Sequence, residues 1–192
     1  GTLVQQRGLV MSNDAAGDLV FQKSVATGNA VAHLEEGQSP LLSVAPQFNG
    51  QGYCSEVTAS VAKKRGKSPA RATEQNPFLR NVRRPMHVRC TDSKPADATE
   101  LARSHLSRML GNAASWDVEL PTIVDRRGDL FRPNTTLTIK APSAMIYGKH
   151  ELLIRSVTKR KDQDSTTAKL GLVLPGAFSG EMPAVLPWQE AL

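Results

Sequence analysis

Histidine and cysteine are the residues that most often serve as metal ligands, catalytic bases or nucleophiles. In this sequence they are scattered. The four histidines are His33, His87, His105 and His150. No two are four residues apart, and none belongs to an HExxH motif, which would place two imidazoles on one helix face. Cys54 and Cys90 have no histidine pair beside them; one disulfide could join them, but we interpret them as two buried thiols. We therefore predict no metal site and no cofactor.

Motifs for nucleophilic or acid–base catalysis are absent from the sequence. It contains no GxSxG, the turn that exposes a catalytic serine. Asp117 and Glu119 share one face of a predicted strand, where a glycoside hydrolase could place its two carboxylates. Alternating charges on a solvent-facing strand explain them more simply. The segment Gly50-Gln-Gly52 lacks the glycine spacing and the helix start of a phosphate loop. The sequence thus predicts no enzyme and no catalytic residue.

Basic residues are concentrated in one part of the chain. The net charge is +6, and residues 63–94 contain ten Lys or Arg against two acidic residues. Such a stretch attracts nucleic acid, an anionic membrane or an acidic protein surface. Phe78 is the only aromatic residue between positions 63 and 89, so few side chains there could stack on single-stranded bases. No helix-turn-helix or zinc-finger pattern is present.

The elements that would position these residues are mostly short strands. Alternating apolar residues and turn signals predict a hairpin from 9–12 and 18–23, then strands over 41–48, 53–62 and 85–91. A short helix is expected over 28–36, with Thr27 as its N-cap and Gly37 at its end. The segment 63–81 lacks periodicity and contains Gly66 and two prolines, which predicts a long, partly mobile loop.

The second half contains the clearest helix and the clearest hairpin. A capping box at 97–100 begins a helix over 97–110 that should end before Gly111. Strands follow over 116–120, 130–131 and 135–140, with a turn at 125–128. The hairpin joins 151–160 to 166–174. Its expected core residues are Leu152, Ile154, Leu170 and Leu172.

Length and composition are those of a globular protein. The chain has 192 residues, of which 40% are hydrophobic and 22% charged. No apolar run approaches the ~20 residues needed to span a bilayer. Because the first residue is Gly1, we expect the sequence to begin within a longer polypeptide. Many short strands and one good helix predict a mainly β fold, a barrel or sandwich that carries a helix.

An ordered series of motifs follows the predicted helix. Trp116-Asp-Val-Glu-Leu-Pro121 comes first, then Gly128-Asp-Leu-Phe-Arg-Pro-Asn134, Leu152-Leu-Ile154, Thr167-Ala-Lys-Leu-Gly-Leu172 and Leu174-Pro-Gly-Ala-Phe178. In this order they resemble the baseplate hub family of contractile-tailed phages, the group of the phage Mu hub and the phage P2 late control protein D. The family's second step reads G-x-L-W-x-P-N, with Phe131 here in place of Trp. Upstream, residues 34–38 and 48–53 resemble the family's L-x-x-G-x-N and Y-x-V-x-G-Q more loosely, so the resemblance covers roughly 28–178.

The resemblance implies a structural role and a fold. Hub proteins of this kind form a homotrimeric ring that joins the tail tube to the central spike. The fold class implied is mainly β with α/β elements, a tube-type β-barrel with an inserted helix. By domain, 1–40 would end a preceding α/β region, 41–175 would be the β-barrel hub domain with its inserted helix 97–110, and 176–192 would be an extended C-terminal tail.

The resemblance also implies partners and a location. The partners are two further copies of the chain in a homotrimer, the central spike protein, the tail tube protein and other baseplate proteins, and DNA would only pass through the lumen. The place is the virion, in the tail baseplate, after assembly in the host cytoplasm. A strongly cationic lining would hold DNA in such a ring, so we expect the basic loop 63–84 to face a neighbouring chain. Its interface candidates are Lys63, Lys64, Arg65, Lys67, Arg83 and Arg84.

An alternative function stays open. The chain could be a basic β-domain that binds nucleic acid or glycan and belongs to a larger tail-associated hydrolase. A ring-forming trimer would favour the hub, whereas a monomer with salt-dependent affinity for oligonucleotides would favour the alternative.

Overall fold

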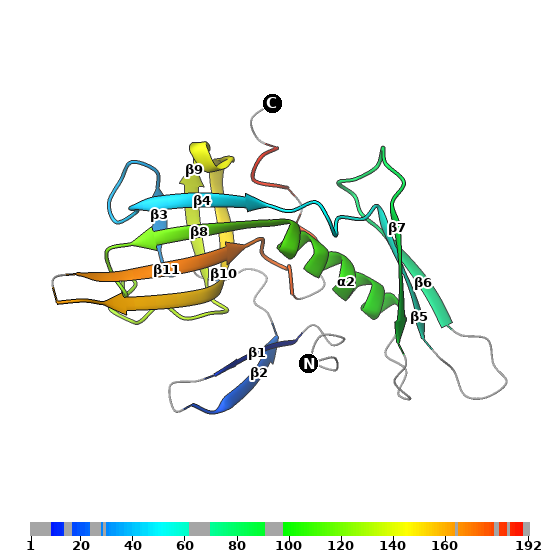
Figure 1. Ribbon diagram of the computed structural model, residues 1–192, viewed down its shortest axis with the longest axis horizontal. Helices are drawn as coiled ribbons and strands as arrows, with labels where there is room; N and C mark the ends of the chain where they lie inside the picture. The colour runs from blue at the N-terminus through cyan, green and yellow to red at the C-terminus, as the bar shows by residue number, and fades with distance from the viewer. Residues whose placement is uncertain are drawn as a thin grey trace. The chain divides into compact units, whose positions relative to one another are not determined.

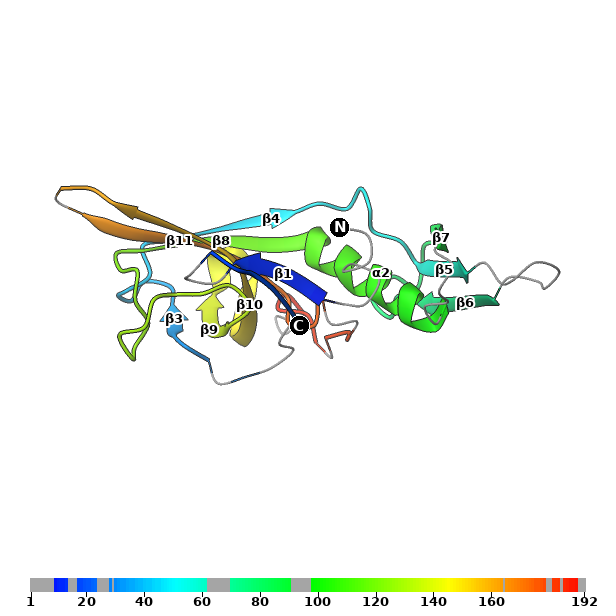
Figure 2. The same ribbon diagram turned by 90° about the horizontal axis from the view of Figure 1, so that it is seen from below.

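The computed structural model describes residues 9–13, 17–23, 28, 30–61, 70–90, 98–163, 165–178, 181–183 and 185–189. The chain divides into two compact units, each made of three separate segments. Unit 1 consists of Gly1–Ser24, Asn49–Ala113 and Ala177–Met182, and unit 2 of Val25–Phe48, Ala114–Gly176 and Pro183–Leu192. Figures 1 and 2 show their elements in two views. No helix among the described residues is long and apolar enough to cross a membrane.

Unit 1 contains a three-stranded sheet packed against one helix (Figure 1). The central strand β5 (Glu56–Val61) is antiparallel to β6 (Ala70–Gln75) and parallel to β7 (Pro85–Cys90). One face of this sheet packs on α2 (Ala98–Ala113). The fully buried core between them includes Val57, Ala59, Val61, Leu101, Ala102 and Leu106. Cys54 has a free, buried thiol, so the chain forms no Cys54–Cys90 disulfide.

The helix α2 confirms the prediction for its position but not for its end. It continues through Gly111 to Ala113, so the expected stop at Gly111 is wrong. Glycine is needed there for close packing, because a Cβ atom at position 111 would lie 2.5 Å from the Cβ of Ala177. The predicted first residue of the capping box, Asp97, lies outside the described residues. On α2, His105 is half-buried, whereas four apolar side chains are buried: Leu101, Ala102, Met109 and Leu110.

A two-stranded hairpin also belongs to unit 1. β1 (Leu9–Asn13) pairs with β2 (Leu19–Lys23) in antiparallel register, which confirms the predicted hairpin. Leu19 and Phe21 of β2 are about half exposed. Their exposure follows from the geometry, because two strands alone have no second layer that could cover an apolar face.

Unit 2 contains a six-stranded sheet in the order β3-β9-β10-β11-β8-β4. Its neighbouring strands are antiparallel except for β3 and β9. The strands are β3 (His33–Glu35), β4 (Ser43–Phe48), β8 (Ala114–Leu120), β9 (Thr136–Ala141), β10 (Ile146–Lys161) and β11 (Thr166–Val173). A short 3-10 turn, η1 (Pro142–Ala144), joins β9 to β10.

The core of unit 2 follows the predicted alternation of apolar residues. On β8, Trp116, Val118 and Leu120 are fully buried, and the Trp116 indole donates a hydrogen bond to the Ala144 carbonyl oxygen (2.9 Å). The four predicted core residues of the β10–β11 hairpin are fully buried, which confirms the prediction: Leu152, Ile154, Leu170 and Leu172. A register shift between Ile154 and Ser156 brings the Ser156 side chain over Gly171. A Cβ atom at position 171 would lie 2.5 Å from the Ser156 hydroxyl oxygen.

Three predictions for local structure are wrong. The segment expected as a helix over 28–36 contains strand β3 instead, because pairing with β9 buries Ala32 and Leu34 while His33 stays exposed. The segment expected as a loop over 63–81 contains strand β6, which pairs along the whole of β5. In the segment 130–131, Leu130 forms only an isolated bridge with Val124.

The mainly β fold with α/β elements is confirmed. The sheet order of unit 2 has two ends, β3 and β4, so the described strands do not close a barrel. Both ends are poor templates for a further strand: β3 has three residues, and β4 contains Pro46, which lacks a backbone donor. The part of β10 beyond β9 ends in Lys159, Arg160 and Lys161, which protect its free edge by charge.

Candidate functional site

The histidines and acidic residues considered for catalysis are dispersed over the fold. His33 lies on β3, His87 on β7, His105 on α2 and His150 on β10. Within the described part of the chain, no three His, Cys, Asp or Glu side chains lie close enough together to hold a metal ion.

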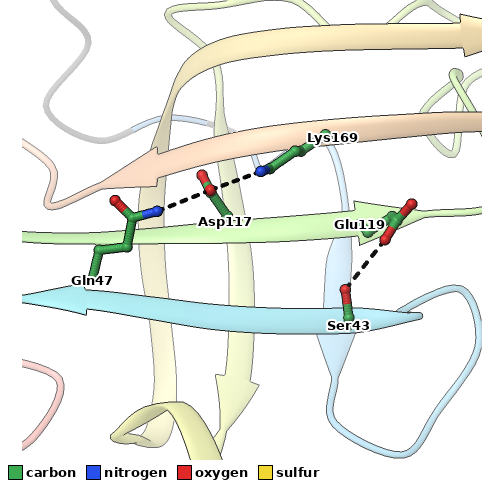
Figure 3. A network of polar contacts seen from close by, with 5 residues as sticks. All are labelled: Ser43, Gln47, Asp117, Glu119 and Lys169. Atoms are coloured by element: carbon green, nitrogen blue, oxygen red, sulfur yellow. Dashed lines mark hydrogen bonds and ion pairs between the residues drawn. The ribbon is translucent and has the colours of Figure 1, made fainter.

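Asp117 and Glu119 lie on the outer face of β8, where each belongs to a different polar contact (Figure 3). Asp117 accepts a hydrogen bond from Gln47 (3.0 Å) and forms an ion pair with Lys169 (2.9 Å). Glu119 accepts a longer hydrogen bond from the Ser43 hydroxyl (3.5 Å). These contacts join the strands of one sheet face, as expected for alternating charges on a half-exposed strand.

A serine–histidine contact on the outer face of the unit 1 sheet was not expected from the sequence. The Ser60 hydroxyl and His87 Nε2 are 2.7 Å apart. This is the spacing of a nucleophile and its base, but such a base also needs a third group to orient it. The structure gives His87 no such contact among the described residues. Two further cross-strand pairs, Thr58–Thr73 (2.9 Å) and Gln75–Glu56 (2.9 Å), line the same face, so we interpret all three as strand-to-strand contacts.

This outer face is also cationic. Arg71 on β6 and Arg89 on β7 are both exposed, and both lie opposite Ser60 in the strand register. Neighbouring strands are about 4.8 Å apart, so the two Cα atoms are separated by roughly 10 Å across β5. This pair could be predicted only if the pairing of β6 with β5 were known, and the sequence predicted a loop where β6 lies.

The interface candidates from the basic stretch divide into three groups. Lys63, Lys64, Arg65 and Lys67 lie outside the described residues. Arg84 braces a turn, because its guanidinium donates to the carbonyl oxygens of Gly50 (3.0 Å) and Gln51. Arg83 is exposed and lines an open pocket of about 680 Å³ together with Arg80.

A half-buried cation on α2 was also missed. Arg108 has a buried Nε atom with no hydrogen-bond partner, and no ion pair joins it to an acidic group of the described residues. Burial lowers the pKa of its guanidinium. One turn earlier, burial lowers the pKa of His105 below its ordinary value, and the positive charge of Arg108 lowers it further. The two residues therefore form a poorly solvated basic pair on one side of α2.

The net charge of the protein belongs entirely to unit 1. Its segments contain fourteen Lys or Arg and eight Asp or Glu, a net charge of +6, whereas unit 2 contains ten of each. At long range, where the net charge of each unit dominates, unit 1 therefore attracts an acidic partner more strongly than unit 2.

Comparison with solved structures finds a similar fold in two tail proteins. No protein-family model and no curated protein sequence matches the chain. The structure is similar to the 43 kDa tail protein of prophage MuSo2 from Shewanella oneidensis (TM-score 0.74, 20% identity, covering 92% of this chain and 53% of that one). It is also similar to a tail protein from Neisseria meningitidis MC58 (TM-score 0.75, 16% identity, covering 92% and 54%).

A more distant similarity is to a chain in the virion of a native gene transfer agent particle (TM-score 0.56, 16% identity, covering 96% and 39%). The chain thus spans about half the length of the two bacterial tail proteins, and the likeness to all three is one of fold.

Proposed function

We propose that the protein is a structural component of a phage tail or of a related injection particle. The observation that carries this proposal is the fold, which is shared with two tail proteins over 92% of the chain. That coverage extends over segments of both units. A structural role also fits the scattered placement of the potentially catalytic side chains.

More specifically, we propose the baseplate hub: a homotrimeric ring that joins the tail tube to the central spike and lets DNA pass through its lumen. The motif series that suggested this family has a clear structural basis in unit 2. Phe131, which stands where the family has Trp, is buried, and Asn134 adopts a left-handed conformation (φ 63°) just before β9. Its backbone N–H donates to the Ile154 carbonyl oxygen (2.8 Å), which ties the motif to the β10–β11 hairpin.

The contacts that unit 2 makes between subunits of such a ring would use side-chain surfaces more than added strands. The free edges in unit 2 are short, interrupted by Pro46 or highly charged, and these are features that oppose edge pairing. In a ring with cyclic symmetry each subunit presents two different surfaces, one to each neighbour. We place the exposed basic residues of unit 1 on one of them.

The oligomeric state tests the proposal most directly. The purified chain is analysed by light scattering and negative-stain electron microscopy over a range of concentrations. We expect rings of three subunits, or incorporation at the end of the tail in particles that carry a tagged copy. A chain that stays monomeric at all concentrations and is absent from purified particles would refute the hub role.

A second function is supported by one observation, the pair Arg71 and Arg89 on the exposed sheet face of unit 1. Such a surface would also attract a nucleic acid backbone. Oligonucleotide affinity measured at two salt concentrations separates the functions. A monomer whose specific affinity falls steeply with salt and disappears in Arg71→Ser/Arg89→Ser would favour nucleic-acid binding.

A further inference from the structure

The helix α2 covers only part of the sheet in unit 1. It packs on β5 and β6, and Arg103 on its β6 side forms an ion pair with Glu74 (3.1 Å). Strand β7 lies on the other side of β5 and is an edge strand. Met86 and Val88, which point to the α2 side of the sheet, remain partly exposed there. One apolar strip of the sheet is therefore incompletely covered.

The half-buried basic pair of α2 lies on this same side. With 3.6 residues per turn, each residue is displaced by about 100° around the helix axis. Ala102 faces the sheet core, and Arg103 is about 100° from it on the flank of α2 that contacts β6. His105 and Arg108 are about 60° and 120° from Ala102 in the opposite direction. The side of α2 that carries them is thus the side toward β7.

Arg108 has no ion-pair partner among the residues that the structure describes. A partly desolvated guanidinium loses hydration, and its buried Nε–H makes no hydrogen bond to the described part of the chain in return. Arginine in such a place is usually stabilised by a carboxylate, because the planar guanidinium matches its two oxygens. The described residues supply none: Glu74 pairs with Arg103, which is on the far side of α2.

We propose that the β7 side of unit 1 binds an extended acidic segment of another protein chain. The segment adds to the free edge of β7, places an aliphatic side chain over Met86 and Val88, and brings a carboxylate to Arg108. Strand addition supplies backbone hydrogen bonds, and the alternate side chains supply specificity. This inference rests on the proposed assembly function only for the source of the partner, which is a neighbouring protein of the particle.

The composition of the surface favours a protein partner over a nucleic acid. Met86 and Val88 are aliphatic, whereas single-stranded nucleic acids bind sheets by stacking bases on aromatic side chains. The net charge of +6 on unit 1 would draw an acidic segment toward this unit from a distance. Strand β7 also has no proline after its first residue, so its edge can pair along most of its length.

The test uses the purified full chain and a labelled peptide in which the sequence Val-Glu-Glu-Val is written twice. As a strand, this peptide presents both valine and glutamate on each face. The matched control carries lysine in place of glutamate. Binding is measured by fluorescence anisotropy, and hydroxyl-radical oxidation of Met86 is measured by mass spectrometry. We expect the acidic peptide alone to bind and to protect Met86 from oxidation.

Two variants locate the carboxylate contact. Arg108→Gln should weaken binding about tenfold, as expected for the loss of one charge-assisted hydrogen bond. Arg103→Gln removes the same charge from the other side of α2 and should change the affinity less than about twofold. Equal losses in both variants would show a general charge effect and overturn the proposal. So would protection of Met86 by an oligonucleotide but not by the acidic peptide.

The same Met86 measurement in purified particles distinguishes the two proposals. Protection on assembly identifies the β7 side as a contact in the particle. A chain that binds the acidic peptide at Arg108 but is absent from particles refutes the assembly role and leaves the binding surface intact. A chain that is present in particles with Met86 as reactive as in free solution overturns the proposed docking of a particle protein at β7.

Discussion

Replacement of Gly111 by alanine sets two opposing effects against each other at one position of α2. In a helix interior, alanine is favoured over glycine by about 0.5–1 kcal/mol, because glycine loses more backbone entropy on folding. Here the new Cβ would lie 2.5 Å from the Ala177 Cβ and 3.6 Å from the Ala177 Cα. The first distance is about 1–1.5 Å shorter than the optimal carbon–carbon contact of about 3.5–4.0 Å.

The contact at Ala177 should outweigh the gain in helix propensity. Overpacking typically costs about 1–3 kcal/mol, since backbone atoms must shift. We therefore expect Gly111→Ala to lower the free energy of unfolding by about 1–2 kcal/mol, measured by urea denaturation with an unchanged m-value. Asn112→Ala is the matched control, because Asn112 is exposed on the same turn. This substitution should raise the free energy of unfolding slightly, since alanine has the higher helix propensity.

A double-mutant cycle shows whether the effect arises at this contact. In the Ala177→Gly background the crowding Cβ is gone, so Gly111→Ala should then stabilise the protein by about 0.5–1 kcal/mol. If Gly111→Ala already stabilises the otherwise unchanged chain by that amount, α2 is not packed against Ala177. Close packing against Ala177 would then not be the reason for glycine at position 111.

Four further predictions concern the core and the basic residues. Leu170→Ala should lower the free energy of unfolding by about 2–5 kcal/mol in urea denaturation, and a change below ~0.5 kcal/mol would contradict its burial. His105 has a lowered pKa in the folded state, so the unfolded chain takes up its proton first as the pH falls. The free energy of unfolding should therefore decrease as the pH falls below ~6.5, and this decrease should be smaller in His105→Gln. An equal decrease in both proteins would show that the pKa of His105 is not lowered in the folded state. Arg108→Met should raise the melting temperature of the free chain, because it removes an unsatisfied buried donor; a lower one would show that Arg108 has a partner there. Serine in place of four basic residues should slow particle assembly without changing the fold: Lys63, Lys64, Arg65 and Lys67. Unchanged assembly together with altered DNA ejection would place these residues at the channel.

Elements with strong local patterns were predictable from the sequence. The β10–β11 hairpin combines clean alternation with a polar turn, and both signals agree with its tertiary pairing. The helix α2 was predicted from its capping box, but Gly111 does not end it and instead packs closely against Ala177, which is far away in sequence. No local rule for helix ends contains that information.

Elements stabilised mainly by pairing were not predictable. The segment around β3 contains residues compatible with a short helix, yet three backbone pairs with β9 decide its conformation. Strand β6 alternates only small and polar residues, Ala70, Ala72 and Thr73 among them, so its burial signal is weak. Because β6 was not predicted, the Arg71–Arg89 pair was not predicted either. The two residues become neighbours only when β6 and β7 both pair with β5.

The charge of the chain is best understood unit by unit. Unit 2 is neutral overall, and some of its surface charges pair with each other, as Asp117 does with Lys169. Unit 1 carries the whole excess of +6 and includes Arg108, a half-buried cation whose Nε atom has no hydrogen-bond partner among the described residues. A self-contained domain gains nothing from such a group, since a buried unpaired charge lowers its stability. The group becomes favourable when a carboxylate from another chain arrives, and this is the strongest physical reason to regard unit 1 as the binding part of the molecule.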